Sequence, residues 1–318
     1  MSDVLVSVVI PARNEAENIG KCIASLLKNS DVPHEIIVID NGSRDATASI
    51  ATDMGVTVLI NPTGTISALR NMGARRARGE LLVFLDADMV VPEGFLKKGK
   101  DYFDRGFTGA LGFDTTVPSD AGWVARVWGQ DLRFKDKKEI NVDFLISRCI
   151  FIKKSTFEEA GGFDELLKTN EDKDFTMRVA KVGYPLVYSN KLRLIHLGYE
   201  KDLFELIRKE FWRQGSTLMF ARRWHFAPRT LRNPMLSLWH IWALLLFMAS
   251  ILYGVKVYAI TTLILWILPS ALIVLKKPDF NVKVMLPLFI LTFIRWNVAG
   301  ISLIAQVVRL ATFRRHYV

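Results

Sequence analysis

Two long runs without a charged side chain lie in the last third of the sequence and set that part apart from the rest. Residues 235–254 supply about 20 such positions, enough for a helix to cross roughly 30 Å of hydrocarbon. Residues 257–275 form a second run, and only a two-residue turn separates it from the first. The pattern predicts a transmembrane helical hairpin over residues 235–275, within a membrane domain that comprises residues 235–318.

A third hydrophobic segment, residues 284–308, differs because Arg295 and Asn297 lie at its middle. An arginine at the centre of a bilayer costs about 3 kcal/mol on insertion scales. A single crossing would also carry the basic residues after position 308 to the outside, against the positive-inside rule. We therefore expect an even number of crossings. Either two half-length helices dip into the bilayer, or a helix pair is buried against a partner subunit of a homo-oligomer.

Charge is distributed unevenly along the chain. Residues 200–318 carry 16 Lys and Arg against 5 Asp and Glu, a balance of +11, whereas the whole chain is +10 and residues 1–199 are therefore at −1. Nucleic-acid-binding domains carry a basic stripe, so the near-neutral first part argues against nucleic acid as a partner. Basic residues beside apolar runs favour binding to membrane lipids. By the positive-inside rule, we predict a multi-pass cell-membrane protein whose N-terminal domain is cytoplasmic.

Residues 201–234 lead into the hairpin. Within them, residues 202–224 place apolar and cationic side chains on different faces at helical spacing, which is typical of a helix on a bilayer surface. Trp212 and Trp224 suit the membrane–water interface. We predict an amphipathic interfacial helix followed by a linker.

The first 90 residues alternate short apolar runs with segments of helical periodicity. The expected strands are residues 4–10, 35–39, 56–60 and 79–85, and the expected helices are residues 15–28, 45–54 and 65–77. Pro11 is expected to end the first strand, because proline cannot donate to a ladder. The buried face of the first helix is expected to comprise Ile19, Ile23, Leu26 and Leu27.

This alternation predicts βαβ units. The expected fold is a Rossmann-like α/β domain over residues 1–200, with a mostly parallel sheet flanked by helices. The first strand is not followed by Gly-x-Gly-x-x-Gly, which argues against a dinucleotide-dependent oxidoreductase.

Asp86-Ala87-Asp88 follows directly on the apolar run that ends at Leu85. Alternation along extended backbone directs both carboxylates to the same side, at the edge of a parallel sheet where ligands usually bind. Two hard oxygen donors there suit a divalent cation that also holds phosphate oxygens. The structural alternative is a solvated turn between a strand and a loop.

Seven motifs resemble those of family-2 glycosyltransferases with the GT-A fold, and they occur in the same order along the chain as in that family. They are VVIPARNE at 8–15, DNGSRD at 40–45, ALRNMG at 68–73, DAD at 86–88, GGFD at 161–164, EDKDFTMR at 171–178 and the stretch 187–196 that ends in histidine. The resemblance covers residues 4 to about 200. It implies a metal-dependent, inverting hexosyltransferase that uses a nucleotide-diphosphate sugar and either Mn²⁺ or Mg²⁺.

The resemblance assigns donor-binding residues. In the family, the loop after the first strand and the carboxylate after the second hold base and ribose, which here implies Pro11, Arg13, Glu15 and Asp40. Arg13 departs from the family, where an aromatic ring is frequent, although a guanidinium plane also stacks on a base. Arg70 is implied to face the donor, where a fixed cation suits a pyrophosphate. For both arginines the alternative is a solvated surface position.

The resemblance also assigns metal and catalytic residues. Asp86 is implied to contact ribose and metal, Asp88 to be the firmer metal ligand, and His196 to supply another metal contact. The cation would stabilise the departing nucleoside diphosphate. Asp172 is implied to be the general base for the acceptor hydroxyl, with Glu171 supporting the acceptor. The alternatives are a hydrogen-bonded core histidine, and a charged N-terminus of a helix that starts near residue 170.

Arg213 and Gln214 belong to the sequence WRQG at 212–215. It resembles a segment that follows the catalytic domain in membrane members of the family and lies beside donor and acceptor, so both residues are further site candidates. The sequence is thus interpreted as a glycosyltransferase that acts at the cytoplasmic face of the membrane. Its acceptor would be a lipid-linked or polyprenyl-linked glycan, as in the synthesis of cell-surface polysaccharide or glycolipid.

Three alternatives stay open. A polyprenyl-phosphate monosaccharide synthase would share the architecture, but usually carries glutamine two residues after the second metal aspartate, where this chain has Val90. A catalytically inactive membrane scaffold is disfavoured by the presence of Asp88 and Asp172. Nucleotidyl transfer would need an early Gly-rich phosphate loop, and the sequence has none.

Overall fold

The computed structural model describes residues 6–129, 139–276 and 282–314, with side chains as far as residue 309. The chain forms two compact units. Unit 1 comprises Met1–Asp120 and Arg133–Tyr199, and unit 2 comprises Ala121–Leu132 and Glu200–Val318. In the residues that the structure describes, unit 1 combines helices with strands, whereas unit 2 is helical.

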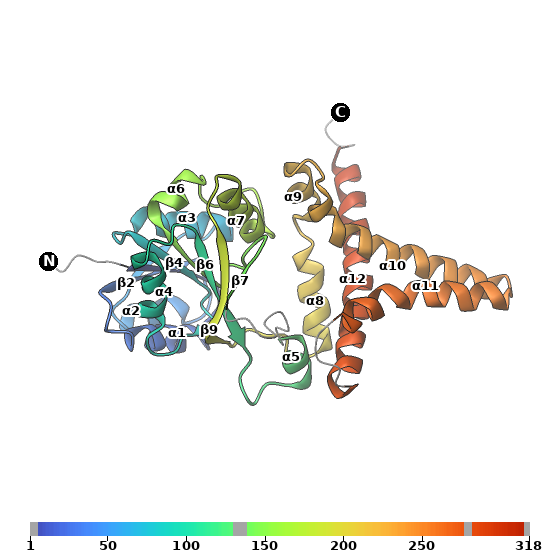
Figure 1. The fold of residues 1–318 in the computed structure, drawn as a ribbon, viewed down its shortest axis with the longest axis horizontal. Coiled ribbons are helices and arrows are strands. Elements are labelled where there is room, and N and C mark those ends of the chain that lie inside the picture. Colours follow the sequence, from blue (N-terminus) through green and yellow to red (C-terminus); the bar gives the residue numbers. More distant parts are fainter. Residues whose placement is uncertain (1–5, 130–138, 277–281, 315–318) are drawn as a thin grey trace. The chain divides into compact units, whose positions relative to one another are not determined.

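Unit 1 is built around a mixed sheet (Figure 1). In its described residues the strands follow the order β3-β2-β1-β4-β8-β6-β9-β5, and β7 pairs with β9. The strands are β1 Val6–Ala12, β2 His34–Asp40, β3 Thr57–Ile60, β4 Leu81–Leu85, β5 Met89–Val90, β6 Ala110–Thr116, β7 Glu139–Asn141, β8 Cys149–Lys153 and β9 Leu186–His196. Neighbours among β3, β2, β1 and β4 are parallel, whereas β8 is antiparallel to β4 and β6. The predicted α/β fold class is confirmed, with a mixed sheet that is parallel over its first four strands.

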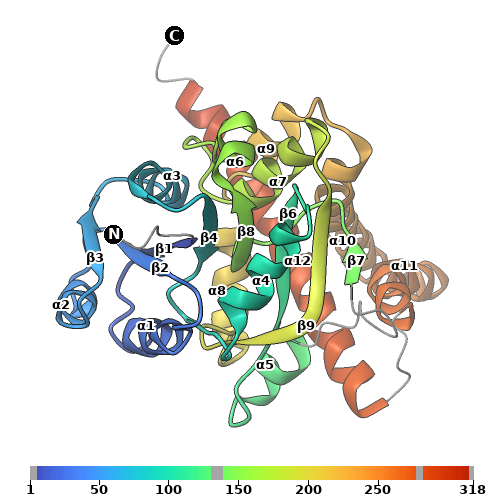
Figure 2. The same cartoon turned by 60° about the vertical axis from the view of Figure 1, so that its left-hand side comes forward.

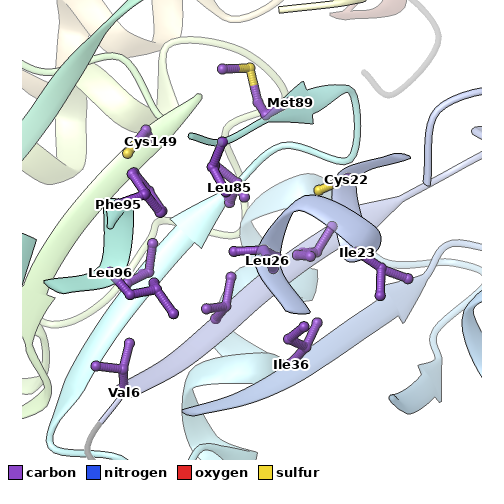
Figure 3. Close-up of a cluster of buried hydrophobic side chains, with 14 of the residues drawn as sticks. Val6, Cys22, Ile23, Leu26, Ile36, Leu85, Met89, Phe95, Leu96 and Cys149 are labelled. Carbon is purple, nitrogen blue, oxygen red and sulfur yellow. The ribbon is translucent and has the colours of Figure 1, made fainter. Parts of the chain in front are cut away.

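Helices cover both faces of this sheet (Figure 2). They are α1 Ile19–Leu27, α2 Thr47–Asp53, α3 Ile66–Arg76, α4 Phe95–Asp104, α6 Lys154–Glu159 and α7 Glu171–Lys181. Successive strand residues point to opposite faces, so Val8 packs in the core with α1, α2 and α4, whereas Val9 packs with α3, α6 and α7. Figure 3 shows the first core, in which Ile23 and Phe95 are buried. Burial on both faces explains why these strands are continuous apolar runs.

β1 extends further than the sequence predicts. Pro11 does not end the strand, which continues to Ala12. The pairing of β1 with β4 covers only Val6 to Val9. The missing N–H of Pro11 therefore falls beyond the stretch that β4 pairs, and the ladder loses no hydrogen bond there.

α1 is shorter than the sequence predicts. It begins at Ile19 rather than at residue 15, because Asn14 is left-handed (φ 54°) and the following residues form a turn in which Ile19 N donates to Glu15 O. Leu27 was assigned to the buried face on periodicity, but its side chain is 48% exposed. The other three residues of that face are buried, as predicted.

Unit 2 contains six helices in its described residues. They are α5 Trp123–Trp128, α8 Leu203–Arg213, α9 Thr217–Arg223, α10 Pro228–Leu252, α11 Lys256–Leu275 and α12 Val282–Arg314. The single helix expected over residues 202–224 is in fact two, α8 and α9, since the chain turns at Gly215, whose N–H donates to Trp212 O. α10 and α11 form the helical hairpin. By length and composition, α10, α11 and α12 are each able to cross a membrane.

α12 replaces the two half-length helices expected over residues 284–308. It is one helix, although it contains Pro287. The polar residues at its middle have partners from other helices of unit 2. Arg295 forms an ion pair with Glu210 at 3.4 Å, and Asn297 accepts a hydrogen bond from Trp266 at 2.9 Å. The ion pair and the hydrogen bond give both side chains a partner in unit 2, and the helix continues through these residues.

Candidate active site

The carboxyl ends of β1, β2 and β4 meet at one edge of the sheet of unit 1. The register pairs Ala12 with Asp40 at the ends of β1 and β2, and Asp86 follows the last residue of β4. Pro11 is buried inside β1, next to this edge. Ligands bind at the carboxyl edge in open α/β sheets, so the fold brings three of the predicted motifs to one place.

Asp40 is oriented by the turn that follows it. The carboxylate is buried and accepts hydrogen bonds from the Ser43 N–H at 2.9 Å and from the Ser43 hydroxyl. Gly42, with φ 65°, supplies the left-handed conformation that lets the chain fold back in this way. Each carboxylate oxygen has a further acceptor site, so Asp40 retains the capacity to accept from a ligand.

The loop after β1 carries Arg13 and Glu15. The Arg13 side chain is exposed, with Nη1 3.5 Å from Asn41 Oδ1 in the turn after β2. Burial, and then the charges of Asp88 and Asp86, raise the pKa of Glu15. Glu15 therefore lies within the electrostatic field of the two carboxylates that follow β4.

Arg70 of α3 is the buried centre of the site. Its side chain is 1% exposed, with Nη2 2.9 Å from Asp86 Oδ1 and Nη1 3.0 Å from Glu171 Oε1. Burial lowers the pKa of Arg70, but the charges of Asp86 and Glu171 outweigh this and raise it, so the guanidinium is charged. The resemblance implies an arginine that faces the donor. In the structure Arg70 lies between two carboxylates, one after β4 and one at the start of α7.

Asp88 and His196 form the second polar pair. Pairing of β5 with β9 sets Met89 opposite His196, and His196 Nε2 lies 3.2 Å from Asp88 Oδ2. Burial raises the pKa of Asp88, but the hydrogen bond and charge of His196 and the charge of Arg148 lower it below its usual value. Gly198 permits this contact, since a Cβ there would lie 1.8 Å from Asp88 Oδ2.

Asp88 offers a donor atom to a cation. Its Oδ1 is buried and has no hydrogen-bond partner among the described residues, and the same is true of His196 Nδ1. A buried carboxylate oxygen without a partner is costly, and a bound cation would satisfy it. No group of three or more His, Cys, Asp and Glu side chains in the described part of the chain forms a complete metal site. The residues nevertheless fit Mg²⁺ in a nucleotide site, where one or two carboxylates suffice and substrate phosphates complete the shell.

Glu171 and Asp172 begin α7, directly after Asn170, whose backbone is left-handed (φ 61°). Glu171 is buried against Arg70, whereas Asp172 is half-buried and accepts a hydrogen bond from Ser147 N at 3.2 Å. Burial and the charge of Asp172 raise the pKa of Glu171 to about 7, despite its ion pair with Arg70. The ion pairs thus connect the end of β4 to the helix that carries Asp172.

Arg148 is a candidate site residue that none of the sequence motifs contains. Its carbonyl oxygen accepts from Asp86 N at 3.2 Å, just before β8 begins. Its guanidinium donates to Thr115 Oγ1 at 3.3 Å, lies 5.7 Å from the centre of the Tyr199 ring, and helps to lower the pKa of Asp88. The guanidinium of Arg148 comes near the carboxylates because β8 pairs antiparallel with β4. No pattern in the sequence indicates that pairing.

Arg213 and Gln214 lie in unit 2, where each has partners. Arg213 pairs with Glu200 and, at 3.4 Å, with Glu210. Gln214 Nε2 donates to Glu210 Oε1 at 2.9 Å. Because both glutamates are buried, these contacts give Arg213 and Gln214 a structural role within unit 2.

The raised pKa of Glu171 predicts a pH-dependent stability for the unliganded protein. The folded state retains this proton up to about pH 7, whereas the unfolded chain releases it near pH 4.5. The stabilisation is complete below pH 4.5 and is lost as the pH rises through 7, by about 3 kcal/mol. We expect the melting temperature of the wild-type chain to fall over this interval relative to Glu171→Gln, which cannot titrate. Identical pH profiles for the two proteins would contradict the raised pKa.

Comparison with known sequences gives a match to the family model described as Glycosyl transferase family 2, over residues 7–161. Glycosyltransferase AglE of Haloferax volcanii is 29% identical over 219 residues, which are 65% of this chain and 70% of that protein. O-antigen biosynthesis protein RfbC of Myxococcus xanthus is 27% identical over 217 residues, which are 60% of this chain but 17% of that longer protein. The matched range contains Asp40, Arg70, Asp86, Asp88 and Arg148.

Solved structures share the fold. A mannosyltransferase from Pyrobaculum calidifontis, PcManGT, in complex with GDP-Man and Mn²⁺, matches with a TM-score of 0.61 at 20% identity, over 93% of this chain and 86% of that chain. S. aureus TarS 1-349 in complex with UDP-GlcNAc matches with a TM-score of 0.53 at 16% identity, over 95% of this chain and 92% of that chain. At these identities the likeness establishes the architecture.

Proposed function

We propose, because the chain belongs to glycosyl transferase family 2, that it transfers a sugar from a nucleoside-diphosphate donor to a lipid-linked glycan at the cytoplasmic face of a membrane. One observation carries the proposal. Asp86, Arg70 and Glu171 form a continuous ion-paired chain from the end of β4 to the start of α7. A glycosyl transfer needs a site for the departing diphosphate and a base for the incoming hydroxyl. These linked ion pairs would hold the diphosphate site and the base next to one another.

The donor would bind along the carboxyl edge of the first strands. Asp40 would accept from a ring N–H of the base and Glu15 from a ribose hydroxyl, and Pro11 would contribute to the same site. The exposed guanidinium of Arg13 suits stacking on a base. GDP-Man in PcManGT and UDP-GlcNAc in TarS support a donor of this class.

Asp88 and Asp86 would hold Mn²⁺ or Mg²⁺, with His196 beside Asp88. When bound, the cation supplies Lewis-acid stabilisation of the charge on a departing diphosphate. Arg148 adds a permanent positive charge next to Asp88, suited to charge-assisted hydrogen bonds with phosphate oxygens. The unpartnered Oδ1 of Asp88 and the Mn²⁺ in the PcManGT complex support this assignment.

Asp172 would act as the general base. A sugar hydroxyl has too high a pKa to attack unaided, so a carboxylate must accept its proton as the new bond forms. The acceptor oxygen bonds to the anomeric carbon, the bond from that carbon to the diphosphate oxygen breaks, and the proton passes to Asp172. A single base of this kind implies in-line displacement with inversion. Glu171, tied to Arg70, would support the acceptor side.

Donor binding by the full chain tests the proposal. A nucleoside diphosphate with Mn²⁺, at about 100 times its Kd, should stabilise the folded state by about 2.7 kcal/mol, and thus raise the melting temperature by several degrees. Asp88→Asn should remove the part of the shift that depends on Mn²⁺. Absence of any shift with UDP, GDP or other nucleoside diphosphates would overturn the assignment.

Products formed by membranes test the acceptor. Incubation with labelled nucleotide sugars should yield a labelled lipid-linked glycan, because the apolar helices and basic residues of unit 2 suit a membrane enzyme. Addition of polyprenyl phosphate should not increase the label. If a polyprenyl-phosphate monosaccharide is the product, the acceptor proposed here is wrong. If no sugar is transferred although the donor binds, the chain is an inactive scaffold.

Arg148→Met should weaken binding of a nucleoside diphosphate about tenfold or more in the presence of Mn²⁺, since hydrogen bonds to charged groups contribute about 1.5–3 kcal/mol. Calorimetric titration measures the change. Arg148→Lys keeps the charge and should recover part of the affinity, and the affinity for the free nucleoside should not change. An equal loss of affinity for nucleoside and for nucleoside diphosphate would show that Arg148 supports the fold and not the phosphates.

A further inference from the structure

α12 lies between two other parts of unit 2, with α8 on one side and the α10–α11 hairpin on the opposite side. Successive residues of a helix are separated by about 100° around its axis. The α12 residues that meet α8 lie within about 60° of one another on this wheel; they are Leu291, Arg295, Ser302 and Gln306. The residues that meet the hairpin lie about opposite; they include Phe293, Asn297 and Gly300.

The face of α12 that meets α8 is polar. Arg295 pairs with the buried Glu210 of α8 at 3.4 Å. Nearer the end of α12, Ser302 Oγ donates to Phe211 O at 2.9 Å and Gln306 Nε2 donates to Gln214 O at 2.7 Å. These three contacts span about three turns of α12, so the two helices run side by side.

The opposite face of α12 crosses the hairpin. A Cβ on Gly300 would lie 2.5 Å from Ser237 O and 2.4 Å from Ile241 Cγ1, so the two backbones approach closely at α10. One turn earlier, Asn297 accepts from Trp266 of α11. α12 therefore meets both helices of the hairpin within one turn. Figures 1 and 2 show it passing across the hairpin near the base and not running along it.

The position of α8 determines how deep α12 lies in the membrane. Arg208 is exposed on α8 and its side chain is 69% accessible, and a charge at the centre of a bilayer is costly. α8 must therefore remain at the membrane surface. Because Arg295 lies near the middle of α12 and pairs with α8, the middle of α12 lies at the surface too. A helix that crossed the bilayer would have its middle in the hydrocarbon.

The hairpin alone has the dimensions of membrane-spanning helices. α10 rises about 31 Å from Arg232 to Tyr253, and α11 rises about 30 Å from Lys256 to Lys276. Both values match the thickness of the hydrocarbon core. Basic residues at the base of the hairpin, and Tyr253 with Lys256 at its tip, suit the two interfaces.

We propose that α12 lies in the plane of the cytoplasmic interface, against the base of the hairpin, and that the described chain crosses the bilayer twice. The proposal rests on the membrane attachment proposed above. Exposed apolar residues form a stripe on the flank of α12 next to the hairpin, where acyl chains would cover them; they are Leu286, Ile290, Ile301, Ile304 and Val308. Composition alone would make α12 a third span. The polar contacts of α12 with α8 favour a position at the interface instead.

Depth measurements on the full chain in lipid vesicles test the proposal. A nitroxide is attached to a cysteine introduced at Leu286, Ile290, Ile301 or Ile304, and its collisions with oxygen and with a polar nickel chelate report the depth. The four sites on α12 should share one depth, although residues 286 and 304 are about 27 Å apart along the helix. Matched control sites at Leu245 and Leu252 of α10 should differ in depth by about 10 Å. The wild-type chain should take up no label, because Cys22 and Cys149 are buried.

Each result has a distinct meaning. These collisions report the distance to the nearer surface, so a greater depth at residues 290 and 301 than at residues 286 and 304 would show that α12 crosses the bilayer, and would overturn the proposal. Equal depths at Leu245 and Leu252 would show that the hairpin lies flat, and would overturn the two crossings. A chain that does not associate with vesicles would instead refute the membrane attachment on which the proposal rests.

Discussion

Asp172→Asn should lower turnover about 10³-fold while the affinity for a nucleoside diphosphate stays close to that of the wild-type chain. General-base catalysis contributes about 10²–10⁴-fold, and the amide that replaces the carboxylate cannot accept the proton of the acceptor hydroxyl. The substitution preserves shape, and the amide oxygen is able to keep one of the two hydrogen bonds that the carboxylate accepts, from Ser147 N at 3.2 Å or from Lys173 N at 2.7 Å. The change should therefore affect the chemical step and leave the donor site intact.

Two measurements on the purified full chain check this prediction. Initial rates with a labelled nucleotide sugar give turnover, and the shift of the melting temperature with nucleoside diphosphate and Mn²⁺ gives donor binding. The matched control is Asp164→Asn, which makes the same chemical change outside the cluster. Unchanged turnover in Asp172→Asn would refute the assignment of the base. Loss of donor binding would show that the carboxylate acts on the donor.

Arg70→Met should lower the melting temperature by about 10 °C and abolish transfer. Removing one partner of a buried ion pair costs about 3–5 kcal/mol, because the other charge stays buried without compensation. For a domain of this size, each kcal/mol shifts the melting temperature by about 2–4 °C. Arg70 has two such partners, Asp86 and Glu171, at 2.9 and 3.0 Å. Its loss should also separate α7, and with it Asp172, from the end of β4.

Arg75→Met is the matched control on the same helix. The Arg75 side chain is 69% exposed and lies 3.9 Å from Glu165, and exposed ion pairs contribute about 0–1 kcal/mol. Its melting temperature should change by only a few degrees at most. Adding Glu171→Gln to Arg70→Met should restore part of the stability at pH values well above 7, where the buried Glu171 carboxyl would otherwise lose its proton without a partner. Equal effects of Arg70→Met and Arg75→Met would contradict the central role of Arg70.

Local periodicity accounts for most of unit 1. The central strands carry apolar residues on both faces, because neighbouring positions such as Val8 and Val9 face two different cores, and the structure has both. The boundaries are less predictable: Pro11 is tolerated inside β1 because β4 pairs with only the first four residues of that strand. Such an exception depends on the length of a neighbouring strand, which the residues around the proline do not specify.

The site was predictable only in part. Asp86 and Asp88 lie at the end of a buried strand, and their place at the sheet edge follows from that position. The role of Arg70 does not follow, because its partner Glu171 is 101 residues away and the contact depends on the packing of α3 and α7 beside β4. Arg148 does not follow from the sequence for the same reason, since its charge acts on Asp88 through an antiparallel pairing that leaves no periodic signal.

Local sequence patterns specify the α/β class, the helical hairpin and the carboxylates that follow the strands, because these depend on neighbours within a few residues. Which charges are paired, and where helices lie with respect to one another, follows from the packing of distant segments. Arg295 illustrates the difference. From the sequence it is an unfavourable charge in the middle of an apolar helix, whereas in the fold it pairs with Glu210 of α8. The free energy of a buried charge depends on its partners in space, and these partners are distant in sequence.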